Sequence, residues 1–156
     1  MNEGDDPGVE RRMTLRGLHH VTALCRDMER TIAFYRDLLG LTVVDDGHSD
    51  DDPETRHVWF GAGGDGDGAI APGTLVSFLE YPALPQGVVG AGSTHHFALA
   101  VGSAAEQVAW RDYLRAQGVE CTDVFDRGRF TSLYLRDPDG HIVEIATAAQ
   151  EGPEPG

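Results

Sequence analysis

Two stretches of this chain repeat one pattern, and an internal repeat limits the fold more than any single motif does. Residues 18–41, LHHVTALCRDMERTIAFYRDLLGL, begin with a His pair, continue as a short apolar strand and pass into a helix that ends at Gly40. Residues 94–119, THHFALAVGSAAEQVAWRDYLRAQGV, follow the same order, with Gly118 at the end of the helix. The sequence therefore predicts two copies of one strand and helix unit.

Three further strands are expected after each helix. The apolar runs are LTVVDD, RHVWFG and GTLVSFLE in the first copy, and VECTDVF, FTSLYLR and HIVEIAT in the second. Residues 137–140, Asp-Pro-Asp-Gly, are a strong turn signal between the last two runs. Each unit thus has the order βαβββ. We expect an α+β fold in which two βαβββ modules form a curved, half-open mixed β-sheet.

The helices carry their own boundary signals. Asp27 is suited to cap the first helix, and Gly40 to the left-handed position after its end. Ser103 with Glu106 has the spacing of a capping box for the second helix. The stripes that we expect to face inward are Met28, Ile32, Tyr35, Leu38 and Leu39 in the first helix and Val108, Trp110 and Leu114 in the second.

A chain of 156 residues that is 40% hydrophobic is long enough for one well-buried domain. We expect that domain to span residues 15–149, with modules at about 15–82 and 92–149. Residues 1–14 and 150–156 are rich in Gly, Pro, Asp and Glu, which predicts disordered tails.

Charge and composition exclude several functions. The net charge of -14 argues against nucleic acid or an anionic membrane surface as a partner, because such binding rests on clustered Lys and Arg. No apolar run approaches the roughly 20 residues that span a bilayer, and the N-terminus is acidic and polar, so a cytoplasmic location is expected. Cys25 and Cys121 form no CxxC pair, which argues against a disulfide framework or a thiolate zinc site.

Three side chains have the composition of a metal site. Side chains alternate along a strand, so only one His of each pair can face the concave side of the sheet, and that phase selects His20 and His96. Glu144 shares its face with Ile142 and Ala146, and a carboxylate among apolar neighbours needs a partner such as a cation. Two imidazoles and one carboxylate form the facial triad of non-haem Fe(II) oxygen chemistry.

A simpler interpretation applies to each residue alone. A single strand histidine is more often a hydrogen-bonded core or surface residue than a ligand. Equivalent histidines at the starts of two repeats, with a Glu at the end of the second, are harder to explain by packing.

The chain resembles the vicinal oxygen chelate superfamily, which includes extradiol ring-cleaving dioxygenases, glyoxalase I and the bleomycin- and fosfomycin-resistance proteins. The resemblance covers residues 15–148 and is carried by GLHHVTAL with FYRDLLGL, by THHFALAV and by YLRDPDGHIVEIA. It implies that His20, His96 and Glu144 are the metal ligands.

Further residues are similar to those of the dioxygenase branch. Tyr134 stands at the position of its active-site tyrosine, and Arg127 matches a supporting arginine of the hydroquinone-cleaving members, although a half-buried aromatic and a solvated turn residue are the structural alternatives. His19 and His95 should face away from the metal and orient the ligands or relay protons. His57 is a substrate-facing acid/base candidate whose strand phase is open.

The resemblance implies an Fe(II)-dependent extradiol dioxygenase that uses O2 to cleave a catechol- or hydroquinone-type aromatic diol, as in aromatic degradation. Mn(II) would suit the triad as well. Extradiol members usually carry four modules, whereas this chain has two. Because the full ligand set is in one chain, we expect one domain to be able to form a whole site, and a homodimer is allowed without being required.

Two other functions remain open. A glyoxalase I-like metal-dependent lyase or isomerase would use a fourth ligand from the first module, where Ser77 or Phe78 stands near the matching point and Glu80 a little later. A metal-free drug-binding resistance protein would use the same cleft without an ion. A zinc hydrolase lacks the support of an HExxH helix.

Overall fold

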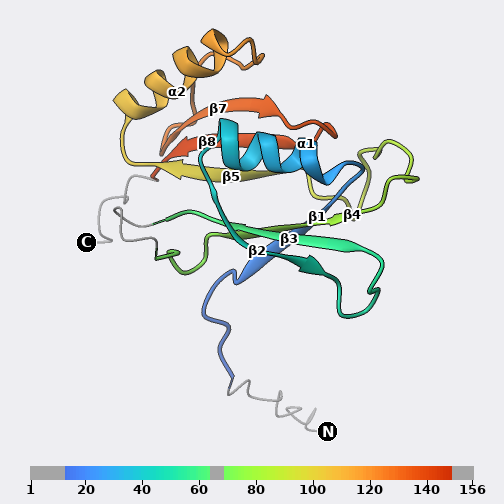
Figure 1. The fold of residues 1–156 in the computed structure, drawn as a ribbon. Helices are drawn as coiled ribbons and strands as arrows, with labels where there is room; N and C mark the ends of the chain where they lie inside the picture. The colour runs from blue at the N-terminus through green and yellow to red at the C-terminus, as the bar shows by residue number, and fades with distance from the viewer. Residues whose placement is uncertain (1–12, 64–68, 149–156) are drawn as a thin grey trace, which may run out of the picture.

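The computed structural model describes residues 13–63 and 69–148. Apart from residues 13 and 14, the expected tails lie outside these ranges. The first module contains β1 (His20–Cys25), α1 (Met28–Ile32) continued by the π-helix η1 (Ala33–Leu38), β2 (Thr42–His48), β3 (Arg56–Gly61) and β4 (Leu75–Glu80). The second contains β5 (His96–Val101), α2 (Ala104–Ala116), β6 (Phe125–Asp126), β7 (Thr131–Arg136) and β8 (Ile142–Thr147) (Figure 1).

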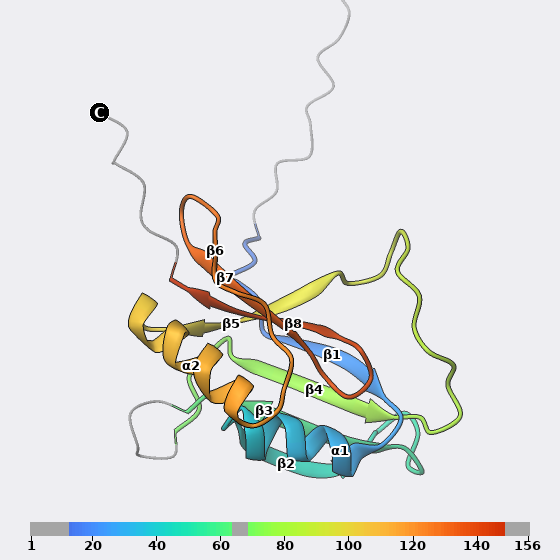
Figure 2. The same ribbon diagram turned by 90° about the horizontal axis from the view of Figure 1, so that it is seen from above.

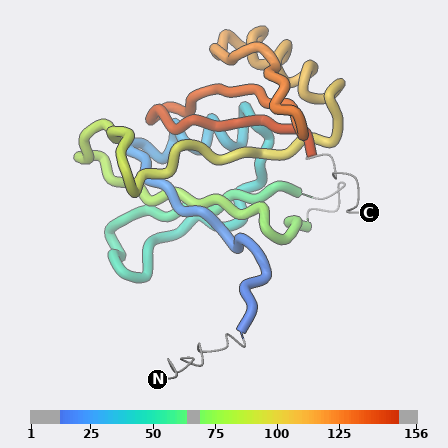
Figure 3. The backbone as a smooth tube through the Cα atoms, turned by 180° about the vertical axis from the view of Figure 1, so that it is seen from behind, coloured from blue at the N-terminus to red at the C-terminus, as the bar shows by residue number. Residues whose placement is uncertain are grey.

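Each module forms its own four-stranded mixed sheet. The strand orders are β1-β4-β3-β2 and β5-β8-β7-β6, and within the described residues no strand pairing joins the two sheets. In both sheets the first strand runs parallel to the last strand of its module, and the remaining pairs are antiparallel. The structure thus confirms two βαβββ modules with mixed sheets, and Figure 3 shows the second module above the first.

The helix starts follow the predicted capping chemistry. The Asp27 side chain accepts a hydrogen bond from the Arg30 amide at 3.1 Å, and Ser103 accepts one from the Glu106 amide at 3.2 Å. The Glu106 carboxylate in turn accepts from the Gly102 amide at 2.7 Å. Gly40 has a φ of 76°, as expected for the residue after a helix end.

The prediction for the inward face of α2 is partly wrong. Leu114 is fully buried as expected, but Val108 is 40% exposed, and the neighbouring Gln107 is fully buried instead. The Gln107 amide donates hydrogen bonds to the Thr131 and Ile145 carbonyl oxygens at 2.9 and 2.8 Å. A polar side chain is therefore buried here because it satisfies two backbone groups of the sheet.

The strand expected at 119–125 is also shorter than predicted. Only Phe125 and Asp126 pair as β6, and Cys121 forms an isolated bridge with Leu135. The Thr122 hydroxyl accepts a hydrogen bond from the Tyr134 amide at 3.0 Å, so a side chain takes a position in the ladder that a strand backbone would fill.

Tyr35, on η1, joins the two sheets in one core. Its ring lies 4.7 Å from the ring of Phe78 in the first sheet and 6.3 Å from that of Phe97 in the second, measured between centroids. Figure 2 shows α1 lying over the first sheet. The helix-covered faces of both sheets thus share one core. Side chains alternate along a strand, and His20 and His96 fall at the positions of β1 and β5 that point away from this core. Both histidines therefore lie on the helix-free faces of their sheets.

No helix in residues 13–63 or 69–148 is long and apolar enough to cross a membrane. The two cysteines are free, Cys25 buried and Cys121 half-buried, as expected for small apolar side chains. Burial raises the pKa of the Cys25 thiol to about 11.

Candidate metal site in two halves

His96 and Glu144 meet on the helix-free face of the second sheet. Glu144 pairs in register with Ala98, so the parallel strands β5 and β8 place it two residues along from His96 on the same face. The His96 Nε2 lies 2.9 Å from the Glu144 Oε2, and Glu144 is only 3% exposed. These two atoms are of the donor types expected in a non-haem metal site.

Ser132 completes the surroundings of this carboxylate. It lies on β7, is fully buried, and its hydroxyl donates a hydrogen bond to the Glu144 Oε1. Sequence reasoning missed Ser132; the available signal was its spacing of two residues from Tyr134 on one strand, which puts both on one face. The carboxylate is thus held by a hydroxyl on one oxygen and an imidazole on the other.

Tyr134 and Arg127 border the same pair. Tyr134 is directly opposite Glu144 in the β7–β8 register, and its ring meets that of His96 edge-on at 5.9 Å. The Arg127 Nη2 donates to the Tyr134 hydroxyl at 3.1 Å, and its guanidinium lies over the rings of Phe125 and Tyr134. Arg127 therefore has fixed partners although it lies in a turn. We call His96, Glu144, Tyr134 and Arg127 the second-module cluster.

His20 and His57 lie together on the helix-free face of the first sheet. Trp59 separates them, with ring centroids 4.8 Å from His20 and 5.0 Å from His57. The His57 Nε2 is 2.9 Å from the hydroxyl of buried Ser77, which is 2.9 Å from the Thr22 hydroxyl. These contacts show that the His57 side chain lies on the helix-free face of β3, the point that the sequence left open. We call His20, His57, Trp59 and Ser77 the first-module cluster, of which sequence reasoning had missed Trp59.

The His pairs have the same geometry in both modules. The His19 Nδ1 is 2.9 Å from the His20 Nδ1, and the His95 Nδ1 is 2.9 Å from the His96 Nδ1. One nitrogen of each pair carries the shared proton, so the contact fixes the ring of the candidate ligand and leaves its Nε2 directed elsewhere.

The two clusters do not meet within one chain. In the part of the chain that the structure describes, no three His, Cys, Asp or Glu side chains gather closely enough to hold a metal ion. The ring contacts of His20 are to His19 and Trp59, whereas His96 contacts His95, Tyr134 and Glu144. The structure does not show the whole site that we expected one copy to form, since His20 and His96 have no side-chain partner in common among the described residues.

Glu80 is not directed toward His20. Its carboxylate accepts a hydrogen bond from the Met28 amide at 2.5 Å, at the start of α1, and so lies on the helix-covered side. Ser77, paired in register with Thr22, is the residue of β4 on the helix-free face beside His57. The first-module cluster therefore presents a hydroxyl where a glyoxalase I-like site would need a carboxylate.

The turn before β8 is anchored in the core by Asp137. This carboxylate accepts hydrogen bonds from the amides of Asp139 and His141 and from the Tyr35 hydroxyl, each at 2.9 Å. Burial raises the pKa of Asp137, and burial followed by the nearby Asp137 raises that of Tyr35. The turn fixes where β8, and hence Glu144, begins.

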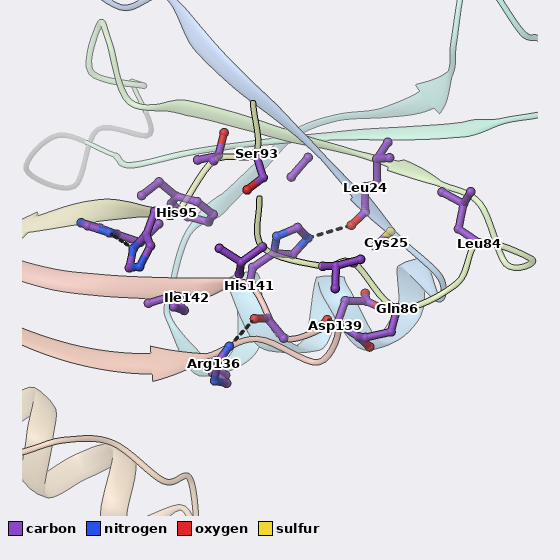
Figure 4. A pocket seen from close by; sticks show the side chains of 18 of the residues that line it. Leu24, Cys25, Leu84, Gln86, Ser93, His95, Arg136, Asp139, His141 and Ile142 are labelled. Carbon is purple, nitrogen blue, oxygen red and sulfur yellow. Dashed lines mark hydrogen bonds between the residues drawn. The ribbon is translucent and has the colours of Figure 1, made fainter. Parts of the chain in front are cut away.

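A pocket of about 440 Å³ opens beside β1, between the loop at residues 84–89, the start of β5 and the turn before β8 (Figure 4). His141 crosses it, with its Nε2 2.8 Å from the Leu24 carbonyl oxygen. Of the predicted ligands the pocket is lined by His96, beside His95 and opposite Thr22 of β1.

Residues 17–145 match the family described as the Glyoxalase/Bleomycin resistance protein/Dioxygenase superfamily. The chain belongs to this superfamily. It is 29% identical over 140 residues to MhqA of Bacillus subtilis, which is named as a candidate ring-cleaving dioxygenase, with 90% of this chain and 42% of MhqA covered. It is also 29% identical over 146 residues to a chlorohydroquinone/hydroquinone 1,2-dioxygenase of Sphingobium indicum, with 91% of this chain and 41% of that protein covered.

A solved structure of a candidate dioxygenase from Bacillus subtilis superimposes with a TM-score of 0.74 at 31% identity, covering 87% of this chain and 41% of that one. The chain thus spans about two fifths of the length of these relatives.

Proposed function

We propose that this chain is a metal-dependent extradiol dioxygenase that uses O2 to cleave the ring of a catechol- or hydroquinone-type diol. The proposed ligands are His20, His96 and Glu144, with Fe(II) as the metal and Mn(II) as the alternative. Such an ion would supply Lewis acidity toward the diol and electron transfer toward dioxygen.

The contact between His96 and Glu144 carries the proposal. A buried carboxylate beside an imidazole, 2.9 Å apart, provides two donors of a facial triad, and each is oriented by a further hydrogen bond, from Ser132 and with His95. Two of the relatives, a chlorohydroquinone/hydroquinone 1,2-dioxygenase and a biphenyl-2,3-diol 1,2-dioxygenase, are named for diol substrates, which supports a diol as the substrate here.

Tyr134 would bind a substrate oxygen through its hydroxyl. Its oxygen already accepts a hydrogen bond from Arg127, so its own O–H remains to donate to an oxygen of the diol or of its ring-opened product. The guanidinium charge favours negative charge on that substrate oxygen. Arg127 is the positioning residue of this pair.

His57 would accept a proton from the diol. Its Nε2 is engaged by Ser77, which leaves Nδ1 to take the proton of a hydroxyl group. The ring of Trp59 beside it provides an aromatic surface for a planar substrate.

The test is anaerobic reconstitution of the full chain with Fe(II) or Mn(II), followed by a panel of catechols and hydroquinones. Oxygen uptake and the absorbance of a ring-fission product are recorded together, with Glu144→Gln as the inactive control and Val108→Ala as the surface control. Consumption of diol and O2 in equal amounts supports the proposal. Turnover of a hemithioacetal without oxygen uptake, or oxygen uptake that survives Glu144→Gln unchanged, overturns it.

A further inference from the structure

Two hydroxyl groups connect His57 to the edge strand of the first sheet. The His57 Nε2 lies 2.9 Å from the Ser77 hydroxyl, and the Ser77 hydroxyl lies 2.9 Å from the Thr22 hydroxyl. These residues stand on β3, β4 and β1, which are neighbours in the sheet (Figure 1). The hydrogen bonds thus form a continuous path across three strands, from an imidazole to the edge strand.

Strand register explains why the path is continuous. Thr22 and Ser77 are partners in the β1–β4 ladder, and Ser77 and Trp59 are partners in the β4–β3 ladder. His57 lies two residues before Trp59, so the alternation of side chains places it on the same face, diagonal to Ser77. The backbone pairing of the sheet therefore holds all three polar groups in line.

Ser77 can pass a proton along this path and in no other direction. It is fully buried, and within the described residues its hydroxyl contacts two groups, the His57 ring and the Thr22 hydroxyl. A hydroxyl group has one hydrogen to donate and lone pairs to accept, so Ser77 can accept from one neighbour while it donates to the other. Reversal of both hydrogen bonds moves one proton from one end of the path to the other.

Thr22 connects the path to solvent. It is exposed on β1, and Ser77 is the one hydrogen-bond partner of its hydroxyl in the part of the chain that the structure describes. It also lines the pocket of about 440 Å³ beside β1. The Thr22 hydroxyl is thus able to donate to water while it remains bonded to Ser77.

We propose that Ser77 and Thr22 form a proton relay that serves His57. In the resting protein the His57 Nε2 carries the ring proton and donates it to Ser77, while Nδ1 is free to accept. When Nδ1 takes a proton from a hydroxyl group of the substrate, the Nε2 proton passes to Ser77, the Ser77 proton to Thr22 and the Thr22 proton to water. One proton enters at Nδ1 and one leaves at Thr22, and both hydrogen bonds then point the opposite way.

The relay lets one imidazole act repeatedly without leaving the substrate. An imidazole that takes a proton and releases none becomes a cation and cannot accept the next one. Release through Nε2 restores the neutral ring of His57 in place. Ser77 and Thr22 act through His57, so they are positioning residues. The source of the proton rests on the proposed function, whereas the path between His57 and solvent does not.

Ring-proton exchange in the metal-free protein tests the path. In protein with isotope-labelled histidine, NMR shows which ring nitrogen of His57 carries the proton and how fast that proton exchanges with water, with His57→Gln to assign the signal. We expect the Nε2–H form in wild type. In Thr22→Val we expect exchange to be at least about tenfold slower, because a donor without a path to water exchanges through local opening. A resting ring protonated at Nδ1 alone, or equal exchange rates in wild type and Thr22→Val, overturns the relay.

Turnover provides the second readout. Thr22→Val should lower kcat by about 10-fold with KM changed by less than about twofold, a part of the roughly 10²–10⁴-fold that proton transfer contributes to such reactions. Thr22→Ser keeps the hydroxyl, whereas Thr22→Val keeps the methyl group, so only Thr22→Ser should retain the wild-type kcat. Thr42→Val makes the same change at an exposed position of β2 in the same sheet and should leave both constants unchanged. Equal losses in Thr22→Ser and Thr22→Val would show a packing role and overturn the relay.

A double variant tests whether the two hydroxyl groups belong to one path. Ser77→Ala interrupts the path at its middle and should lower kcat as much as Thr22→Val, with circular dichroism to establish that the fold is retained. The Ser77→Ala/Thr22→Val chain should lose no more than either single variant, because one interruption is enough. A loss equal to the product of the two single losses would show two independent effects and would reject the relay.

The two readouts separate this proposal from the proposed function. Slower ring-proton exchange in Thr22→Val, with no oxygen-dependent cleavage of any diol by wild type, leaves the path standing and rejects the dioxygenase. Ring cleavage at equal rates in wild type, Thr22→Val and Ser77→Ala, with equal ring-proton exchange in wild type and Thr22→Val, does the reverse.

Discussion

The Nε2 of His96 lies 2.9 Å from the Oε2 of Glu144, and the other oxygen of the same carboxylate accepts a hydrogen bond from Ser132. The parallel pairing of β5 with β8 creates this contact, since it puts Ala98 opposite Glu144. A carboxylate that is 3% exposed is costly to bury unless polar groups engage it. The fold thus holds two of the proposed donors in position before any ion binds.

Replacement of Glu144 should abolish tight metal binding. Glu144→Gln keeps the shape of the side chain and its capacity to accept from Ser132, but it removes the negative charge. We expect Mn(II) affinity to fall by more than about 100-fold, because even changes to groups behind a ligand cost 10- to 100-fold. Titration calorimetry measures this, with circular dichroism to establish that the fold is retained. Unchanged affinity would remove Glu144 from the ligand set.

Replacement of Ser132 should lower the Mn(II) affinity by less than replacement of Glu144 does, but by a measurable amount. Ser132→Ala removes the hydrogen bond that orients the carboxylate, so Mn(II) affinity should fall by about 10- to 100-fold with the ligand itself intact. Ser132→Thr retains a hydroxyl and should recover part of the loss if the larger side chain is accepted. Equal affinities for Ser132→Ala and wild type would show that Glu144 needs no such support.

Substitutions of Tyr134 and of Arg127 should change kcat to different extents. Tyr134→Phe removes the hydroxyl that we propose contacts the substrate oxygen, and we expect kcat to fall by about 100-fold or more. Arg127→Lys retains the charge but loses the planar group over the rings of Phe125 and Tyr134, so a smaller fall in kcat with little change in KM is expected. Steady-state oxygen uptake gives both constants. A Tyr134→Phe enzyme with only KM changed would assign this tyrosine to binding alone.

The alternation of side chains along a strand predicted correctly that His96 and Glu144 share a face, but it could not predict how the two sheets are arranged. Alternation placed His96 with Glu144, and the structure brings them together. Whether His20 reaches them depends on how η1 packs the sheets together through Tyr35, which no local pattern encodes. Ser132 was missed because its spacing from Tyr134 indicates a shared face of β7 but not which side chain of β8 it contacts. The partners of a metal ligand are set by strand register, and register is a tertiary property.

Asp137 should make stability depend on pH. Burial raises its pKa in the folded protein above the ordinary value of 3.8, so between these two values the folded state binds more protons than the unfolded state. By linkage, the free energy of unfolding then decreases as pH rises through that window. Asp137→Asn cannot ionise and should lack this decrease. Urea unfolding of both proteins from pH 3.5 upward measures the difference, and parallel curves would show that the carboxyl is not perturbed.

Gln107, in the first turn of α2, should contribute more to the free energy of unfolding than the exposed Gln117 at the other end of the same helix. The Gln107 amide donates to the Thr131 and Ile145 carbonyl oxygens, and its own oxygen accepts from the Thr131 hydroxyl at 2.7 Å. Gln107→Leu fills the same space but leaves these buried groups without partners, at about 1–3 kcal/mol for each lost one. We expect a total loss of about 2–4 kcal/mol.

The matched control for Gln107→Leu is Gln117→Leu, which makes the same chemical change at an exposed position. Surface substitutions of this kind usually change stability by less than about 0.5 kcal/mol. Urea midpoints at constant slope give both values. If Gln107→Leu cost no more than Gln117→Leu, the two sheet carbonyls would be satisfied without this side chain, and the attachment of α2 to β7 and β8 would rest on apolar packing from residues such as Leu114.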